Sequence, residues 1–256
     1  MTGVKICGLC RPEDARAAAD AGADWTGVIL APGGRRSRTP EQARAILDAA
    51  RGAGRVGVFV DADVEEAGGI AVRLRLDVIQ LHGGESPERV AAIREAGRWR
   101  VWKAVRPRDH AELRDAIARF ADVADALLLD GWSARAAGGT GTRFPWRVVE
   151  EERDAWPDGV RLVVAGGLTP ATVVGAVRRL RPDAVDVSSG VERRVGRKDA
   201  DLVRAFVRRA RSARPSSEAD VSADVVGPDG TPASGARDAR DGVDARRAER
   251  GTTASE

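Results

Sequence analysis

Short apolar runs alternate along the chain with longer segments in which apolar residues recur every three or four positions. The runs have the length of buried strands, and the longer segments have the period of amphipathic helices. Several helical segments open with proline, which is favoured in the first helical turn. The predicted strands are 4–7, 26–30, 56–60, 77–81, 99–105, 126–130, 161–165 and 184–187. The helical segments include 12–21, 40–50, 87–96, 109–121, 170–180 and 199–210.

The order of strands and helices predicts the fold. Strands separated by helices pair in parallel, because a parallel crossover must return along the sheet and a helix does so compactly. Eight such units can close into an α/β barrel of the (β/α)8 or TIM-barrel type. An open doubly wound sheet is the alternative, but its nucleotide-binding members carry GxGxxG after the first strand, and the sequence from Gly8 lacks it. We therefore predict a closed eight-stranded parallel barrel.

The helical and strand pattern stops near residue 212. Beyond it Ser, Pro, Gly, Asp and Arg dominate, aromatic residues are absent, and apolar spacing fits no element. Such a polar segment cannot bury a core. We predict a barrel catalytic domain over 1–211 and a disordered polar tail over 212–256, which we interpret as a passive extension rather than a partner-binding segment.

Composition narrows the class of protein. The 256 residues, 43% of them hydrophobic, suit one barrel-sized domain. The chain has neither an apolar run near the roughly 20 residues of a membrane helix nor a signal peptide at its start, so a cytoplasmic location without membrane contact is expected. Cys7 and Cys10 are the only cysteines and offer neither a disulfide framework nor a complete zinc site. We expect reduced thiols and no metal.

The charge distribution indicates a small anionic ligand. The formal net charge is +3; residues 212–256 carry six Arg and nine acidic residues, a net −3, which leaves +6 on residues 1–211. Nucleic-acid binding would require clustered basic residues beside aromatic side chains, whereas these arginines are scattered along helical segments. We expect no nucleic-acid partner. The sequence does not determine the oligomeric state, and a monomer is the simplest expectation.

In such barrels, catalytic groups lie at the carboxyl ends of the strands. The first predicted strand ends at Cys7, and alternation places Lys5 and Cys7 on the inner face. A buried thiol is more often inert packing, but at this edge it becomes a base where positive charge or helix N-termini lower its pKa. The sixth strand ends at Asp130, which is either a helix or loop cap or an acid facing Cys7 across the barrel mouth.

Two glycine-containing loops predict a phosphate site. Gly166 and Gly167 follow the seventh strand, and Ser188, Ser189 and Gly190 follow the eighth. Barrels often present backbone N–H groups to a phosphate at these two positions. Either loop alone would be an ordinary turn, but both together favour a phosphorylated ligand.

Other strand ends supply weaker candidates. Gln80 and His82 share one side of the fourth strand, where His82 is either a substrate contact or a satisfied structural histidine. Arg35, Arg36 and Arg38, after the second strand, can hold a carboxylate or remain solvated.

Two further features are left open by the sequence. The stretch 138–142 is either a mobile lid or a flexible loop. Lys5 and Lys103, two of the three lysines, have inward parity in this interpretation and suggest a paired charge network low in the barrel, although Lys103 could be only an edge charge.

Six short motifs follow one another in chain order. They are Lys5-Ile6-Cys7-Gly8, Gln80-Leu81-His82-Gly83, Leu127 to Asp130, Gly138-Gly139-Thr140-Gly141, Gly166-Gly167-Leu168 and Asp186 to Glu192. Together they resemble phosphoribosylanthranilate isomerases, and the resemblance spans residues 3 to about 211. It implies a cofactor-free Amadori rearrangement in tryptophan biosynthesis that converts N-(5-phosphoribosyl)anthranilate into 1-(o-carboxyphenylamino)-1-deoxyribulose 5-phosphate. The enzyme class implied is an intramolecular oxidoreductase interconverting an aldose and a ketose.

The resemblance also implies residue roles. Asp130 would protonate the furanose ring oxygen and Cys7 would remove the proton from C2, which requires a protonated Asp130 and an ionised Cys7. Arg36 would contact the anthranilate carboxylate, His82 belongs to the strand-four motif, and Asp186 would lie near the sugar hydroxyls. The loop after the second strand is richer in glycine and arginine than the family pattern, so its other two arginines are rivals for the carboxylate.

Two alternatives compete with this function. One is another sugar-phosphate isomerase or synthase on the same barrel, which phosphate loops alone would not distinguish. The other is a catalytically silent barrel that binds a phosphorylated ligand or a protein partner. The pair of Cys7 and Asp130 favours the isomerase, because related barrels often use two carboxylates instead.

Overall fold

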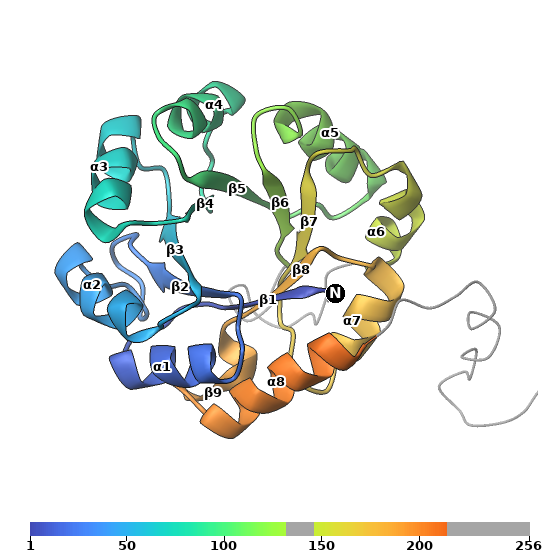
Figure 1. The fold of residues 1–256 in the computed structure, drawn as a ribbon. Helices are drawn as coiled ribbons and strands as arrows, with labels where there is room; N and C mark the ends of the chain where they lie inside the picture. Colours follow the sequence, from blue (N-terminus) through green and yellow to red (C-terminus); the bar gives the residue numbers. More distant parts are fainter. Residues whose placement is uncertain (132–145, 214–256) are drawn as a thin grey trace, which may run out of the picture. The chain divides into compact units, whose positions relative to one another are not determined.

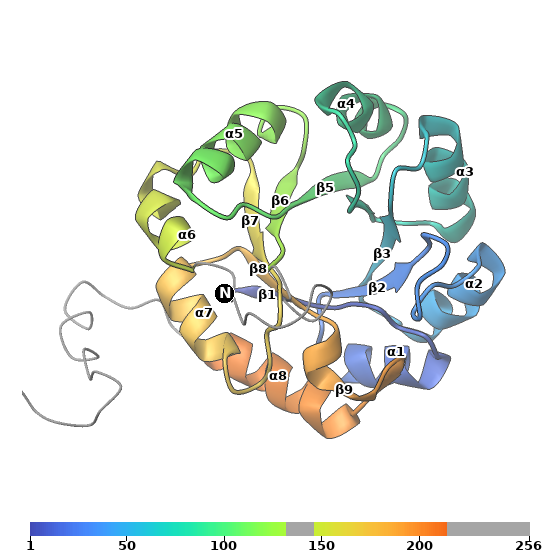
Figure 2. The ribbon, with the colours of Figure 1, turned by 180° about the vertical axis from the view of Figure 1, so that it is seen from behind.

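The computed structural model describes residues 1–131 and 146–213, in which eight parallel strands form a closed barrel. Each strand pairs with the next in sequence, and β1 pairs with β8 to close the ring. Figure 1 and Figure 2 show the helices surrounding the ring of strands. The predicted fold is confirmed. The strands are β1 (Gly3–Ile6), β2 (Trp25–Ile29), β3 (Gly54–Phe59), β4 (Val78–Leu81), β5 (Arg100–Val105), β6 (Ala126–Leu129), β7 (Arg161–Val164) and β8 (Ala184–Val187).

The helices follow the predicted alternation, with differences at some of their ends. Pro12, Pro40 and Pro87 occupy the first turns of α1, α2 and α4, as expected. The helix after β7 begins at Val173 rather than at residue 170, because a turn intervenes in which Thr169 N–H donates to Thr172 Oγ1 at 3.0 Å. The helices are α1 (Pro12–Asp20), α2 (Pro40–Ala49), α3 (Val64–Leu74), α4 (Pro87–Glu95), α5 (His110–Phe120), α6 (Trp146–Glu152), α7 (Val173–Leu180) and α8 (Ala200–Ser212).

The sequence pattern did not single out three elements. The first is the helix α3, which is capped by Asp63, whose side chain accepts from Glu66 N–H. The second is α6, which is followed by one turn of 3-10 helix at Arg153–Ala155. A small antiparallel hairpin of β9 (Glu192–Arg194) and β10 (Arg197–Lys198) follows β8. The hairpin stands against α1, since Lys198 N–H donates to Asp14 Oδ2 at 3.1 Å.

Two layers of apolar residues form the core. One fills the barrel interior and includes Trp102 and Ala104 of β5; the other lies between strands and helices and includes Val4 and Ile6 of β1. Side chains alternate between these layers along each strand. Residues Lys5 and Cys7 therefore face inward, as predicted.

The predicted inward parity of Lys103 is wrong. Its neighbours Trp102 and Ala104 face the barrel interior, so Lys103 points outward toward the helix layer. There its Nζ donates to Glu85 Oε2 at 2.9 Å and to the carbonyl oxygen of Gly83 at 2.8 Å. It is neither an edge charge nor part of a network with Lys5, whose partner is Asp186.

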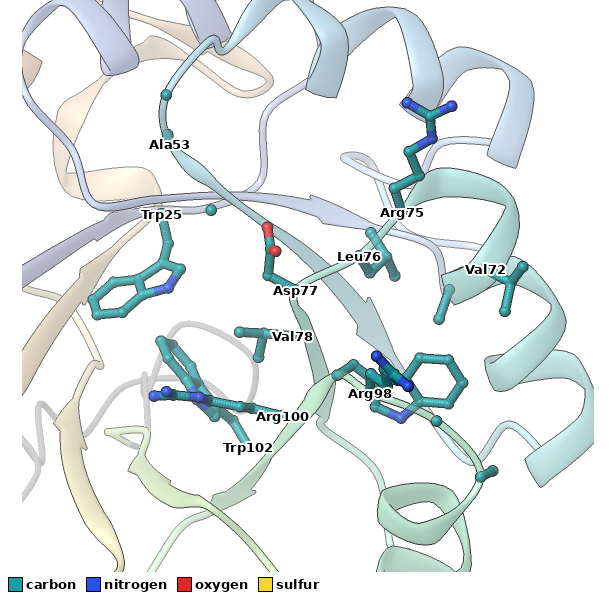
Figure 3. Close-up of a pocket in the computed structure, with 16 residues that line it drawn as sticks. Trp25, Ala53, Val72, Arg75, Leu76, Asp77, Val78, Arg98, Arg100 and Trp102 are labelled. Atoms are coloured by element: carbon teal, nitrogen blue, oxygen red, sulfur yellow. The ribbon is translucent and has the colours of Figure 1, made fainter.

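The amino ends of the strands hold aromatic side chains. The rings of Trp25 and Trp102 meet edge to face with centroids 5.2 Å apart. Figure 3 shows both indoles beside Val78, with Arg98 and Arg100 near them. These residues line an open cavity of 1110 Å³ at this end of the barrel.

Parts of the sequence prediction lie outside the described residues. They are the glycine-rich stretch 138–142 and the tail from residue 214 onward. The chain divides into a unit of residues 1–216, which contains the barrel, and a unit of residues 217–256. The last helix runs to Ser212, one residue beyond the predicted domain end. Of the helices in the described residues, none has the length and apolar character needed to cross a membrane.

Candidate active site

One cavity of 340 Å³ gathers nearly all of the predicted site residues at the carboxyl ends of the strands. Arg36 alone among them is not part of its lining. The cavity also has an apolar wall of Ile29, Val58 and Val60 from β2 and the end of β3, which the sequence analysis did not select. The predicted residues in the lining are Cys7, His82, Asp130, Gly166, Gly167, Asp186, Ser188, Ser189 and Gly190.

Cys7 follows β1 and keeps the strand's inward parity. Its N–H donates to the carbonyl oxygen of Val187 at 2.8 Å, which ties it to the end of β8. The side chain is buried, and burial raises the pKa of the thiol above its ordinary value although the Lys5 ammonium beside it acts in the opposite direction. The resting site therefore holds Cys7 as a thiol.

Asp130 follows β6 and lies within reach of two nitrogen donors. Its Oδ2 is 3.2 Å from His82 Nε2 and 3.3 Å from Arg106 Nε. Burial acts to raise the pKa of Asp130, but the hydrogen bonds from His82 and Arg106 and the positive charge of Arg106 outweigh it and leave the pKa below its ordinary value. The resting site therefore holds Asp130 as a carboxylate.

His82 is held between Gln80 and Asp130. The Gln80 amide nitrogen is 2.9 Å from His82 Nδ1, so in this orientation Nδ1 accepts and the ring proton lies on Nε2, which donates to Asp130. His82 therefore holds the Asp130 carboxylate in position by a hydrogen bond and also lines the cavity. Arg106, which the sequence analysis missed, could have been found as the residue directly after β5.

The two protonation states are the reverse of those that the resemblance requires. A general acid needs its proton before the reaction, and a general base must have lost its own. The site holds Cys7 with its proton and Asp130 without. The protonation states that the resemblance requires are therefore not those of the free site.

Asp186 and Ser188 present polar atoms to the cavity. Asp186 Oδ2 accepts from Lys5 Nζ at 2.9 Å. Its Oδ1 and the Ser188 hydroxyl are both buried and have no hydrogen-bond partner within residues 1–131 and 146–213. A buried polar atom without a partner costs free energy that a bound ligand can recover.

The two glycine loops interlock in a way that other residues would prevent. Gly166 and Gly167 have φ of +83° and +74°, in the region that glycine adopts readily. A Cβ atom on Gly166 would lie 2.0 Å from Gly131 N, and one on Gly190 would lie 1.8 Å from the carbonyl oxygen of Leu168. Gly190 therefore packs directly on the backbone of the loop after β7, and Gly166 packs on the backbone that follows β6. Gly166, Gly167 and Gly190 all line the cavity.

The three candidate arginines after β2 have different surroundings. Arg36 forms a two-pronged ion pair with Glu192, from Nε to Oε1 at 2.8 Å and from Nη2 to Oε2 at 2.6 Å. Arg38 donates to the backbone carbonyls of Cys10 and Ser37, at 3.2 and 2.6 Å. Arg35 is exposed. The carboxylate contact assigned to Arg36 stays a prediction.

Fold and cavity together define a (β/α)8-barrel protein with a thiol, a carboxylate and glycine loops gathered at the carboxyl ends of its strands. Residues 4–209 match the family model described as N-(5'phosphoribosyl)anthranilate (PRA) isomerase. The chain belongs to this family, which confirms the resemblance seen in the six motifs.

Relatives of known sequence and structure agree with this family membership. The N-(5'-phosphoribosyl)anthranilate isomerase of Afipia carboxidovorans is 45% identical, over 83% of this chain and 91% of that relative. The crystal structure of phosphoribosyl anthranilate isomerase from Thermotoga maritima superposes with a TM-score of 0.73 at 37% identity, over 82% of this chain and 99% of that one. A phosphoribosyl anthranilate isomerase in complex with reduced 1-(o-carboxyphenylamino)-1-deoxyribulose 5-phosphate gives 0.70 at 36% identity, over 82% and 99%.

Proposed function

We propose that the protein is a phosphoribosylanthranilate isomerase of tryptophan biosynthesis in which Asp130 is the acid and Cys7 the base. The observation that carries the assignment is the single cavity that contains both groups together with the two glycine loops. The family match over residues 4–209 supports the reaction, and the structure of a relative with a reduced phosphorylated product analogue supports the class of ligand.

The reaction needs one proton given and one taken. Asp130 donates a proton to the furanose ring oxygen as the bond from that oxygen to C1 breaks, which leaves an iminium between C1 and the anthranilate nitrogen. The Cys7 thiolate then removes the proton from C2, and the resulting enolamine tautomerises to the ketone. Asp130 ends without its proton and Cys7 with one, so the two exchange protons with solvent before the next turnover.

The remaining lining residues position the substrate in this proposal. The phosphate binds to the loops of Gly166, Gly167, Ser189 and Gly190, whose backbone N–H groups suit a dianion. Asp186 Oδ1, which has no partner among the described residues, accepts from a sugar hydroxyl.

The aromatic end of the substrate lies on the apolar wall of Ile29, Val58 and Val60. Arg36 then reaches the anthranilate carboxylate through Nη1, because Glu192 holds its Nε and Nη2 and fixes the guanidinium plane. His82 orients Asp130 by a hydrogen bond and also contacts the substrate directly from the cavity wall.

Fluorescence during turnover tests the function and the roles. The purified protein should convert freshly made phosphoribosylanthranilate with loss of the anthranilate-type fluorescence. Cys7→Ala and Asp130→Ala should each lower kcat/KM by about 10²- to 10⁴-fold, the usual contribution of acid–base groups. Cys10→Ala is the matched control and should stay near wild type.

Each outcome has one meaning. No turnover by the wild-type chain contradicts the isomerase function, and binding of the phosphorylated substrate without turnover would support the silent barrel instead. Near-wild-type turnover by both alanine variants contradicts the roles of Cys7 and Asp130. Circular dichroism should show the same secondary structure in all four proteins.

We also propose that residues 1–211 form the catalytic unit and that 212–256 are an appended tail. The family match ends at residue 209, which supports this boundary. A chain truncated after Ala213, where α8 has ended, should keep wild-type kcat/KM. A loss of activity would show that the tail takes part in the function.

Location and assembly are part of the same proposal. We place the enzyme in the cytoplasm as a monomer; Cys7 and Cys10 are both free, which fits a reducing compartment. Light scattering of the full chain at several concentrations should give the mass of one copy. A mass of two copies would contradict the monomer.

A further inference from the structure

Lys5 is a fully buried lysine inside the barrel, two residues before Cys7 on the same face of β1. Its Nζ donates to Asp186 Oδ2 at 2.9 Å, and the register of β1 with β8 places Lys5 directly beside Asp186. A lysine with no exposed surface is costly to keep charged unless anions face it. An ion pair with Asp186 alone would satisfy that need and would not require a place beside the thiol.

Gly27 of β2 shows how close the lysine and the thiol are. A Cβ atom on Gly27 would lie 3.0 Å from Cys7 Sγ, 3.0 Å from Lys5 Cε and 3.4 Å from Lys5 Nζ. The sulfur and the ammonium thus share the small space that a residue without a side chain leaves open. A positive charge at this range favours a thiolate over a thiol.

We propose that Lys5 is a positioning residue whose positive charge stabilises the thiolate form of Cys7. This inference rests on the proposed role of Cys7 as the base. Lys5 remains protonated throughout and transfers no proton. On ionisation, Cys7 releases its proton to water in the cavity, and the thiolate stays beside the Lys5 ammonium. Asp186 and the Cys7 thiolate are both anionic neighbours of Lys5, so they compete for interaction with its ammonium group.

Other charged groups near Cys7 are already partnered. Lys198 of β10, whose field also favours the thiolate, donates to Glu192 Oε1 at 3.2 Å and to the carbonyl oxygen of Ser188 at 2.9 Å. Glu192 is shared with Arg36. Across the cavity, Asp130 pairs with His82. Lys5 is therefore the cation with the most direct access to the sulfur, from the same strand and the same face.

The test titrates the thiol itself. Thiolate formation is followed by ultraviolet absorbance in a Cys10→Ala background, where Cys7 is the only cysteine; the chain has no Tyr, so tyrosinate does not interfere. Lys5→Met should raise the pKa of Cys7 and lower its thiolate fraction about 10- to 1000-fold at a given pH, the range produced by losing a neighbouring opposite charge. The kcat should fall with that fraction, while KM changes little.

Asp186→Asn gives the opposite result. Removing the competing carboxylate leaves the Lys5 charge to the sulfur, so the pKa of Cys7 should fall. Lys5→Arg, which keeps the charge, should restore most of the thiolate fraction lost in Lys5→Met. Circular dichroism establishes that each variant is folded, and if Lys5→Met does not fold, the direction of the Cys7 pKa shift in Asp186→Asn decides the question.

An unchanged Cys7 pKa in folded Lys5→Met, or a raised one in Asp186→Asn, overturns the proposal. The titration is made without substrate, so it separates this inference from the function. If Lys5 shifts the thiol but no isomerisation occurs, the proposed function fails alone. If turnover depends on Cys7 while Lys5→Met leaves its pKa unchanged, this inference fails alone.

Discussion

The two ends of the barrel are built from the same eight strands but carry different kinds of side chain. At the carboxyl ends, ionisable groups and glycine loops line a cavity of 340 Å³. At the amino ends, Trp25 and Trp102 meet over the apolar interior, and arginines stand at the rim of a more open cavity of 1110 Å³. The larger cavity is thus at the end without Cys7 and Asp130.

The difference teaches that volume alone does not locate chemistry in this molecule. The smaller cavity contains buried atoms without a partner within the described residues, Asp186 Oδ1 and the Ser188 hydroxyl, and a thiol and a carboxylate with shifted pKa values. Buried groups of this kind lower stability unless a ligand satisfies them. The amino end supplies packing, since Trp102 is the largest fully buried side chain among the described residues, although its indole Nε1 also has no hydrogen-bond partner there.

Truncating the indole at the amino end should have the largest effect on stability. Trp102→Ala should lower the free energy of unfolding by about 3–5 kcal/mol, because it empties a buried site in the barrel interior. Chemical denaturation measures this, and kcat/KM of the folded variant should stay within a few-fold of wild type. Cys7→Ala should show the reverse pattern. A Trp102→Ala variant that loses catalysis but keeps its stability would break the division between the two ends.

Adding a methyl group to the loop after β8 should impair the proposed phosphate site more than the stability of the barrel. In Gly190→Ala the new Cβ would overlap the carbonyl oxygen of Leu168, so the two loops must move apart. We expect kcat/KM to fall by about 100-fold, mainly through KM, as the phosphate site is displaced. Gly175→Ala in α7 is the matched control, because its Cβ meets only Trp146 at 3.5 Å, and it should raise stability by about 0.5–1 kcal/mol. Equal activity of the two variants would contradict the loop assignment.

The pH dependence of kcat/KM should reflect the protonation states of the free site, in which Cys7 is a thiol and Asp130 a carboxylate. Below the raised pKa of Cys7 and above the lowered pKa of Asp130, each pH increase makes more thiolate and less protonated acid by the same factor. The active fraction is therefore constant, and kcat/KM should be flat above about pH 7, where the substrate phosphate is a dianion. It should decline only as the pH rises past the pKa of Cys7. A rising limb with a midpoint near pH 8 would contradict this assignment.

The smallest effect is expected for the arginines of the amino end. Arg98 is exposed, lines the larger cavity (Figure 3) and makes no ion pair with another described residue. Arg98→Ala should change the free energy of unfolding by no more than about 0.5 kcal/mol. Its kcat/KM should equal that of wild type. A loss of activity in Arg98→Ala would show that this end also takes part in catalysis.

The sequence predicted the parts of the fold that depend on local pattern. Proline at helix starts and apolar runs at strand positions placed the ring of elements, and alternation in β1 placed Cys7 inside. The same reasoning failed for Lys103, because β5 is buried on both faces and has apolar residues on each. Hydrophobicity then gives no direction, and in the structure it is the face of Trp102 and Ala104 that points to the interior.

The site could be predicted as far as its residues end strands. Their partners could not, because those contacts join positions far apart in the chain. Arg36 meets Glu192 across 156 positions, and Asp130 meets His82 across 48. Such pairs depend on the register of the closed ring, and so do the protonation states that follow from them.

The pairing of β1 with β8, which closes the ring, brings residues from the two ends of the barrel sequence together in the cavity. Lys5 and Cys7 come from the first strand, and Asp186 and Ser188 come from the last. During synthesis, Lys5 and Cys7 therefore emerge long before Asp186, the carboxylate that pairs with Lys5. The cavity is therefore complete only after β8 has paired with β1, and we expect turnover in a refolding chain to begin only when that pairing has formed.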